Sequence, residues 1–225
     1  MGVLLAQSIS GLAFLLAVLA FVTCACAGTL GYWQAWAYLA VFGGASALIA
    51  AYLMAYDRGL LARRIHGGPI AEAQRGQQVI QALAALFFLA TFAAAGLDRR
   101  FGGSHVSARA SLAADAVVAL GFGVVFLTFR ANSYAGSTVE VSRGQQVVST
   151  GPYAFVRHPL YAGAALMMLA TPPALGSWLA LPAPIALVAV VAVRLVEEER
   201  FLAMELAGYE DYRRRVPYRL VPFVW

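Results

Sequence analysis

Charged residues are scarce in this sequence: Asp, Glu, Lys and Arg make up 12% of the 225 residues, and lysine is absent. A soluble domain usually has about 25% charged residues. Hydrophobic residues reach 61%, and a single core of this size cannot remove that much apolar surface from water. The composition therefore excludes a soluble domain and a disordered chain, and it predicts an integral membrane protein.

Metal and nucleotide motifs are also missing. The two cysteines, Cys24 and Cys26, lie together in an apolar run, and they are too few for a disulfide scaffold or a metal site. Gly121-Phe-Gly123 has no third glycine, and the sequence contains no P-loop, HExxH or GxSxG motif. We expect no metal ion, and any nucleotide-like cofactor must bind without a dinucleotide-binding domain.

All 16 basic residues are arginines, which outnumber the 11 acidic residues and give a net charge of +5. They are scattered between apolar runs and form no basic stripe, so we expect no nucleic-acid partner. Such a distribution instead predicts topology, because cytoplasmic loops of membrane proteins are rich in basic residues. If six segments cross the bilayer, 13 of the 16 arginines lie on one side. We therefore predict that both termini and the polar segments face the cytoplasm.

Four apolar runs in the first half of the chain are long enough to cross a bilayer. They comprise residues 3–27, 32–56, 79–97 and 112–129, and each has the ~17–25 residues that a crossing requires. The first run lacks a basic segment before it and is longer than a signal-peptide core, so we expect a spanning helix. Residues 1–130 are thus predicted to form a four-helix transmembrane region.

The second half combines polar and apolar segments. Residues 130–158 are polar and have the composition of strands and turns, whereas residues 160–181 are apolar but contain Pro172 and Pro173. Because proline breaks or kinks helices, this run predicts a bent helix or a helical hairpin. We predict an all-α, multi-span membrane bundle with about five or six transmembrane segments, the fifth bent or paired as a hairpin. Its cytoplasmic pocket is expected from residues 131–225.

Two polar clusters fall where apolar runs begin or end. His158 precedes Pro159, which suits the first turn of a helix, and free N–H groups at such a terminus attract carboxylates and other anions. Arg194 and Glu198 are four residues apart and share one helix face. In a membrane this pair is costly unless it is paired, solvated or facing a polar cavity. The alternative interpretation is that His158 and Arg194 are ordinary interfacial side chains.

A third polar segment is the tail from Gly208 to Pro222, which is rich in tyrosine and arginine. This composition suits a lid that lies along the lipid headgroups. A purely structural amphipathic helix has the same composition, so both interpretations stay open.

Three ordered motifs in the C-terminal part resemble the isoprenylcysteine carboxyl methyltransferase family, whose wider group includes membrane phospholipid methyltransferases. They are Gly151-Pro-Tyr-x-x-x-Arg-His-Pro-x-Tyr-x-Gly163, Arg194-x-x-x-Glu-Glu199 and Gly208-Tyr-x-x-Tyr-x-x-x-Val-Pro217. The resemblance implies a membrane methyltransferase that binds S-adenosylmethionine at the cytoplasmic end of its helices and acts on a lipophilic or membrane-accessible acceptor. Residues 131–225 would then form the catalytic and cofactor-binding region.

The resemblance also implies roles for particular positions. The cofactor contacts of the family fall on Gln145, Gln146, Val147, Val148, Tyr153, His158, Pro159, Leu160, Tyr161 and Glu198. The arginine that holds the acceptor falls on Arg194, which is the expected catalytic residue. One departure concerns a glutamine that the family often has shortly before the first motif. The nearest position here is Glu140, which we leave out of the expected site.

The chemistry of the donor agrees with these roles. S-adenosylmethionine carries a sulfonium cation, an amine, a carboxylate and ribose hydroxyls. Glu198 suits the amine or the hydroxyls, and helix-terminal N–H groups beside His158 suit the carboxylate. Tyr153 or Tyr161 offers a π face to the sulfonium. Methyl transfer needs orientation and exclusion of water more than acid–base help, and Arg194 would pair with an anionic acceptor group.

Two other interpretations stay open. Membrane sterol-type reductases that use NADPH end in a similar Arg-His-Pro-x-Tyr and Val-Pro-Tyr-Arg pattern, although their chains are generally far longer, with more spans. A non-catalytic membrane scaffold would keep the motifs only as elements of the fold. The acceptor is also open between an isoprenylcysteine carboxylate, a phospholipid amine, a small thiol and a bacterial isoprenoid.

Overall fold

The computed structural model describes residues 2–65, 67, 75–138, 141 and 144–225. These residues form eight α-helices and a short 3₁₀ helix, and no strand occurs among them. The helices are α1 (Gly2–Ala27), α2 (Trp33–Tyr56), α3 (Arg58–Ile65), α4 (Arg75–Phe101), α5 (Ala108–Ala131), η2 (Gly151–Ala154), α6 (Pro159–Ala174), α7 (Pro182–Glu205) and α8 (Tyr209–Arg215). The prediction of an all-α membrane bundle is confirmed.

The four apolar runs of the first half correspond to α1, α2, α4 and α5. These helices have 24 to 27 residues and are long and apolar enough to cross a membrane. The prediction of an integral membrane protein is therefore supported by helix length as well as composition. Helix α4 extends further than its apolar run at both ends, from Arg75 to Phe101. The polar stretch after α2 contains the additional short helix α3, which hydrophobic periodicity did not predict.

The proline-rich run divides into two helices. Pro172 and Pro173 lie in the last turn of α6, which ends at Ala174. Helix α7 begins at Pro182, where the missing N–H is not needed. The structure thus has the helical hairpin, not a single bent helix. Helix α6 has 16 residues, shorter than the ~20 residues of a typical crossing.

The polar segment of residues 130–158 has a composition that is typical of strands and turns, but its described residues form no strand. Its described residues are a turn after α5, an extended stretch and the 3₁₀ helix η2. A strand needs a neighbouring strand to satisfy its backbone groups, and the described part of the chain supplies none. The described residues of this segment therefore agree with the all-α prediction, although their composition is typical of strands and turns.

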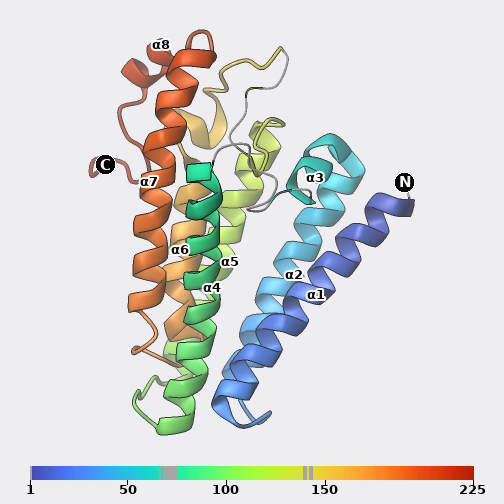
Figure 1. The fold of residues 1–225 in the computed structure, drawn as a ribbon, viewed down its shortest axis with the longest axis vertical. Coiled ribbons are helices and arrows are strands. Elements are labelled where there is room, and N and C mark those ends of the chain that lie inside the picture. The colour runs from blue at the N-terminus through green and yellow to red at the C-terminus, as the bar shows by residue number, and fades with distance from the viewer. Residues whose placement is uncertain (1, 66, 68–74, 139–140, 142–143) are drawn as a thin grey trace.

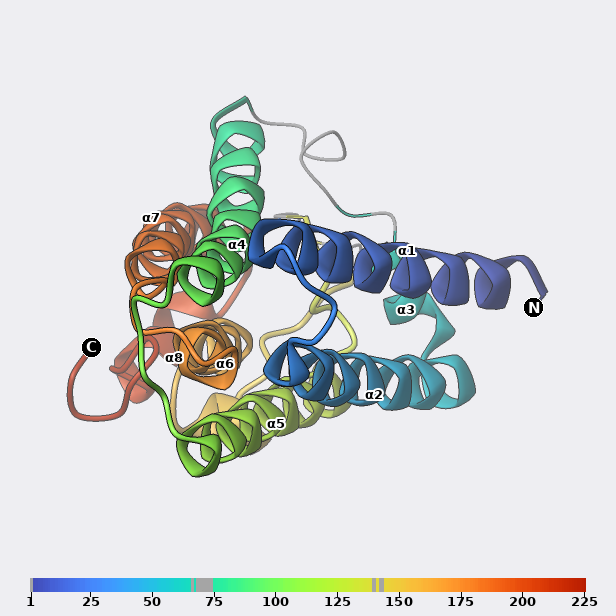
Figure 2. The same ribbon diagram turned by 90° about the horizontal axis from the view of Figure 1, so that it is seen from below.

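Helices α4, α5, α6 and α7 stand side by side, while α1 and α2 lean away from them (Figures 1 and 2). Helix α5 packs closely along α6, and glycine makes the contact possible: a Cβ at Gly121 would lie 2.8 Å from the carbonyl oxygen of Gly163. Small residues allow this approach, which favours association of helices in a membrane.

A cluster of buried aromatic rings joins α2 to α4 and α5. Tyr38 meets Phe92 edge to face with ring centroids 5.5 Å apart, and Phe42 meets Phe122 at 5.2 Å. The hydroxyl of Tyr38 lies 3.1 Å from the hydroxyl of Thr171 on α6, so a buried hydrogen bond accompanies the packing. Aromatic pairs in this arrangement contribute about 0.5–1.5 kcal/mol each beyond their buried area.

The polar segments gather at one end of the molecule. Helix α3, helix α8, the segment between α5 and α6 and the N-terminal end of α1 all lie toward the upper end in Figure 1. This arrangement puts on one side the segments that were predicted to share the cytoplasmic face. The assignment of that side to the cytoplasm stays a prediction.

Candidate functional site

A cavity of about 560 Å³ lies at this polar end. Residues from α2 through α8 line it. All but one of the site residues predicted from the sequence line it. They are Gln145, Gln146, Val147, Val148, Tyr153, His158, Leu160, Tyr161, Arg194 and Glu198. The remaining predicted residue, Pro159, is buried as the first residue of α6 and does not line the cavity. Folding therefore brings together segments that are separated by up to about fifty residues.

The start of α6 holds two of these side chains in a fixed arrangement. Pro159 supplies a preset backbone angle for the first turn, so His158 lies at the N-cap position and Tyr161 follows within the helix. The rings of His158 and Tyr161 stack, with centroids 5.8 Å apart and planes at 26°. His158 is 6% exposed, so its ring is held by packing on the wall of the cavity.

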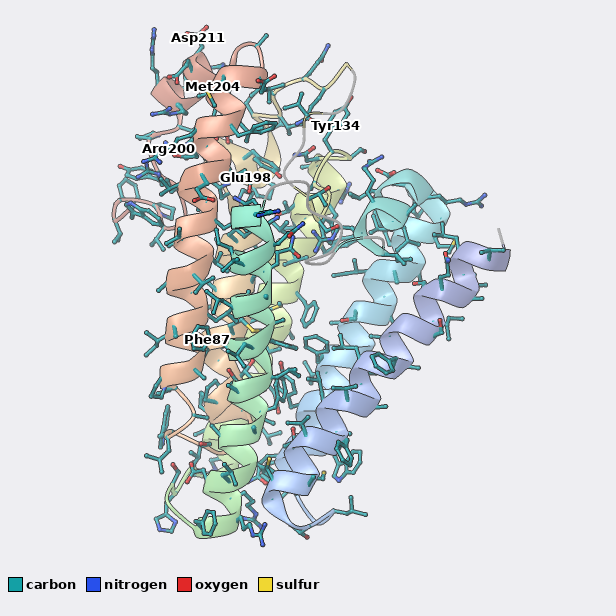
Figure 3. The ribbon with its side chains drawn as sticks, viewed as in Figure 1. Phe87, Tyr134, Glu198, Arg200, Met204 and Asp211 are labelled. Carbon is teal, nitrogen blue, oxygen red and sulfur yellow. The ribbon has the colours of Figure 1, made fainter. Side chains whose placement is uncertain are left out.

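A chain of hydrogen bonds links Arg194 to Glu198. Nε of Arg194 donates to the hydroxyl of Tyr161 at 3.0 Å, and that hydroxyl donates to Oε2 of Glu198 at 2.6 Å. The spacing of four residues predicted that Arg194 and Glu198 share a helix face. The bridge through Tyr161 comes from α6 and could not be derived from that spacing. Figure 3 shows Glu198 on α7, toward the end of the bundle that carries α8.

Tyr153 of η2 forms another part of the wall. Its hydroxyl accepts a hydrogen bond from Nδ2 of Asn132 at 2.9 Å. Burial raises the pKa of Tyr153 to about 12; the charge of Glu198 acts in the same direction, while the bond from Asn132 opposes it. The phenol is therefore neutral at physiological pH and can serve as a polar or π contact.

Helix α8 covers this part of the cavity. Tyr209 and Tyr212 are 4% and 2% exposed, and both line the cavity. The hydroxyl of Tyr212 donates to the carbonyl oxygen of Tyr153 at 2.8 Å, and α8 packs against Val147. Helix α8 of the tail thus forms part of the cavity wall, and its interpretation as a lid along the lipid headgroups stays a prediction.

Glu199 contacts three basic side chains, and the sequence analysis did not select it as a site residue. One of its oxygens, Oε1, lies 2.6 Å from Nε of Arg157 and 3.2 Å from Nε2 of His158, and the other lies 2.9 Å from Nε of Arg219. Nη1 of Arg157 also donates to the carbonyl oxygens of Val216 and Pro217, each at 2.8 Å. The second glutamate of the Glu-Glu199 motif was the available signal.

A backbone hydrogen bond at the start of α6 limits which N–H groups could bind the carboxylate of a cofactor. The backbone N–H of His158 donates to the carbonyl oxygen of Arg219 at 3.0 Å. This N–H is therefore engaged by the C-terminal segment, and Pro159 has none. Any helix-terminal donors for a carboxylate must come from the residues that follow Pro159 in α6.

The N-terminal half contributes to the cavity in addition to residues 131–225, from which the pocket was expected. The apolar walls of the cavity come from several helices and include Ile49, Leu53, Ile80, Ala84, Phe122, Val125 and Phe129, with Met167 of α6. Arg64 of α3 and Gln81 of α4 add polar groups. The cavity therefore has a polar end near α8 and an apolar part within the bundle.

Arg64 lies near Arg194 in this cavity. Its Nη1 donates to the carbonyl oxygen of Gly136 at 2.9 Å, and its guanidinium carbon lies 5.0 Å from the ring centroid of Phe129. Burial lowers the pKa of Arg64, and so does the positive charge of Arg194, while Tyr161 acts in the opposite direction. Sequence reasoning missed Arg64 because it belongs to none of the three motifs.

Glu140, which was left out of the expected site, lies outside the described residues. Cys24 is buried and Cys26 partly buried in α1, and both are free thiols.

Comparison with known proteins finds a similarity over the part of the chain that carries the first two motifs. Residues 110–207 match a family model described as phospholipid methyltransferase. This region is similar to the phospholipid methyltransferase family. It includes most of α5, all of α6 and α7, and every site residue that the sequence predicted. The resemblance to membrane methyltransferases is thus confirmed.

Two curated relatives are similar over parts of the chain. A methanethiol S-methyltransferase of Crocosphaera subtropica (strain ATCC 51142 / BH68) is 39% identical over 72 residues, 32% of this chain and 28% of that protein. A Delta(14)-sterol reductase of Mus musculus is 32% identical over 106 residues, 44% of this chain and 25% of that protein. The similarity therefore spans only about a quarter of the length of either relative.

Proposed function

We propose that this membrane protein transfers a methyl group from S-adenosylmethionine to a lipophilic or membrane-accessible acceptor. One observation carries the proposal: a single cavity joins a polar end, lined by ten of the predicted site residues, to an apolar part within the bundle. A donor with many polar groups suits the first part, and an apolar acceptor suits the second. The family match of residues 110–207 supports the same class of reaction.

The residues of the polar end fit the groups of the cofactor. The carboxylate of Glu198, oriented by Tyr161, would accept hydrogen bonds from the amine or the ribose hydroxyls. The neutral phenol of Tyr153 would contact the ring system or the sulfonium. A volume of about 560 Å³ lies within the ~300–1,000 Å³ of small-molecule sites. S-adenosylmethionine supplies an activated methyl group when bound.

Arg194 would hold the acceptor next to the donor. It is 8% exposed, and Tyr161 connects it to the expected cofactor contact Glu198. Its guanidinium is a suitable partner for an oxyanion. The protein would then contribute orientation and the exclusion of water, which are the main requirements of an in-line methyl transfer.

Calorimetric titration of the purified protein with S-adenosylhomocysteine tests the proposal. We expect binding in the micromolar range, and we expect Glu198→Gln to weaken it at least about tenfold through loss of a charge-assisted hydrogen bond. Glu205→Gln is the matched control, because Glu205 is an exposed residue of the same helix and does not line the cavity. Wild-type protein that binds no S-adenosylhomocysteine would contradict the proposal.

The similarity to a Delta(14)-sterol reductase favours a second candidate, an NADPH-dependent reductase. The same titration with NADPH separates the two candidates. Binding of NADPH without binding of S-adenosylhomocysteine would support the reductase. Binding of neither would support a non-catalytic scaffold.

A further inference from the structure

The segment that follows α8 presents large apolar side chains outward. Val221, Phe223 and Val224 are 50%, 88% and 77% exposed. Helix α8 differs, because its exposed side chains are all charged. Apolar side chains that gather in one exposed segment mark a surface that contacts lipid or another molecule. The apolar loop, residues 221–225, is such a surface.

This apolar loop has a defined backbone. The carbonyl oxygen of Trp225 accepts hydrogen bonds from the N–H groups of Arg219 and Val221, at 2.9 Å and 3.2 Å. The guanidinium carbon of Arg219 lies 5.2 Å from the ring centroid of Trp225. Phe223 has a φ of 65°, a left-handed conformation that is rare for an aromatic residue and persists only where the surrounding structure imposes it. The exposed side chains therefore belong to a folded loop.

The apolar loop lies level with the start of a helix that is long and apolar enough to cross a membrane. Figure 1 shows the C-terminal end beside the bundle, at about the level where α4 begins. The first residues of α4, including Arg75 and Gln77, are polar, and its apolar run follows them. Figure 2 shows the C-terminal end outside the bundle, on the side that carries α7 and α8. The loop is thus level with the point at which α4 changes from polar to apolar.

The residues of the loop and its neighbours suit the boundary between lipid headgroups and acyl chains. Tryptophan and tyrosine are enriched at this boundary, and arginine can keep its charge among the headgroups while its stem packs on apolar groups. The rings of Phe223 and Tyr218 have centroids 5.1 Å apart, and Trp225 lies beside Arg219. Apolar side chains flanked by such residues bind at the surface of a bilayer.

Hydrogen bonds connect the loop to the start of α6. The backbone N–H of Arg157 donates to the carbonyl oxygen of Tyr218 at 2.9 Å. The backbone N–H of His158 donates to the carbonyl oxygen of Arg219 at 3.0 Å, and Nε of Arg219 donates to Glu199 at 2.9 Å. Because His158 lines the cavity, a contact that holds the loop in place also holds one wall of the cavity.

We propose that residues 221–225 form a membrane anchor. Their exposed apolar side chains insert at the boundary between headgroups and acyl chains, and this contact with lipid holds the start of α6 in place. The partner is the bilayer and not another protein, because the loop is level with the start of a candidate spanning helix. The inference is independent of the proposed function, since insertion into lipid involves neither a methyl donor nor an acceptor.

Quenching of tryptophan fluorescence by brominated lipids tests the position of the loop. Trp33→Phe, Trp36→Phe and Trp178→Phe together leave Trp225 as the single tryptophan of the sequence. The protein is placed in nanodiscs of phosphatidylcholine and phosphatidylglycerol. We expect lipids brominated in the upper part of their acyl chains to quench Trp225 strongly, and aqueous iodide to quench it weakly.

A tryptophan at position 204 is the matched control. Met204 is 76% exposed and lies further along α7 toward α8 than Arg200 (Figure 3). In Met204→Trp, with Trp225→Phe added, we expect iodide to quench more strongly than brominated lipid. Two results would overturn the inference: strong quenching of Trp225 by iodide without quenching by brominated lipid, or quenching by neither. The second result would show that protein covers the loop.

Hydrogen–deuterium exchange in the same nanodiscs tests the link to α6. Phe223→Ser combined with Val224→Ser should speed exchange of the Arg157 and His158 amides at least about fivefold, because the segment that accepts their hydrogen bonds loses its anchor. Val224→Ser alone keeps the contact between Phe223 and Tyr218 and should give a smaller increase. Met204→Ser is the control and should leave exchange unchanged. Unchanged exchange in the double variant, or an equal increase in Met204→Ser, would contradict the anchor.

Discussion

Glu198 and Glu199 are neighbours on α7, yet they lie in opposite kinds of surroundings. Glu199 is 3% exposed, and two arginines and a histidine surround its carboxylate. Glu198 lines the cavity and accepts a hydrogen bond from Tyr161. The difference shows that the two adjacent acidic residues of one motif have different roles. One joins segments of the protein, and the other faces the place where a ligand would bind.

Helix geometry accounts for this division. A helix has 3.6 residues per turn, so successive side chains point in directions about 100° apart. Glu199 therefore points toward the start of α6 and the C-terminal segment, while Glu198 points toward the cavity. Arg157 and Arg219 reach Glu199 from segments on either side of α7 in the sequence. The C-terminal segment is thereby fixed to the residues that present His158.

The largest effect is expected from Glu199→Ala. The substitution leaves the buried guanidinium of Arg157 and the imidazole of His158 without their carboxylate, and losing one partner of a buried ion pair costs about 3–5 kcal/mol. We expect a marked fall in the unfolding temperature in detergent. Glu198→Gln should change the unfolding temperature little, because Glu198 accepts a hydrogen bond from Tyr161 and faces the cavity. Equal unfolding temperatures for wild type and Glu199→Ala would break the comparison.

The sequence predicted much of the fold and one end of the site. Apolar runs identified four long helices because a bilayer demands long apolar segments. The prolines at 172 and 173 indicated the hairpin because proline cannot continue a helix. The three motifs indicated residues that meet at one cavity. Each of these signals depends on residues that are close together in the chain, so it can be recognised in a single sequence.

The contributions of Arg64 and Glu199 could not be predicted in the same way. Arg64 reaches the cavity because α3 packs against the segment at Gly136, 72 residues further along the chain. Arg157 and Arg219 meet at Glu199 because the C-terminal segment returns to the start of α6. Contacts of this kind depend on how helices pack, and periodicity and spacing carry no information about them.

Arg194→Ala tests the residues of α7 that face the cavity. We expect cofactor binding to change less than turnover, because Arg194 is proposed to hold the acceptor and is linked to the expected cofactor contact Glu198 through Tyr161. Loss of one charged contact to the acceptor should lower kcat/KM about tenfold to a hundredfold. Transfer of a labelled methyl group into membrane lipid extracts measures turnover, and calorimetry measures cofactor binding. Unchanged turnover would remove the acceptor role.

The smallest effect is expected from Tyr161→Phe, which removes the hydroxyl between Arg194 and Glu198 and keeps the ring that stacks on His158. A hydrogen bond to a charged group contributes about 1.5–3 kcal/mol, but here two charged groups can rearrange around the vacated position. We expect S-adenosylhomocysteine to bind about threefold to tenfold more weakly, with an unfolding temperature close to that of wild type. If the variant unfolds as early as Glu199→Ala, Tyr161 belongs with the structural cluster and not with the ligand-facing one.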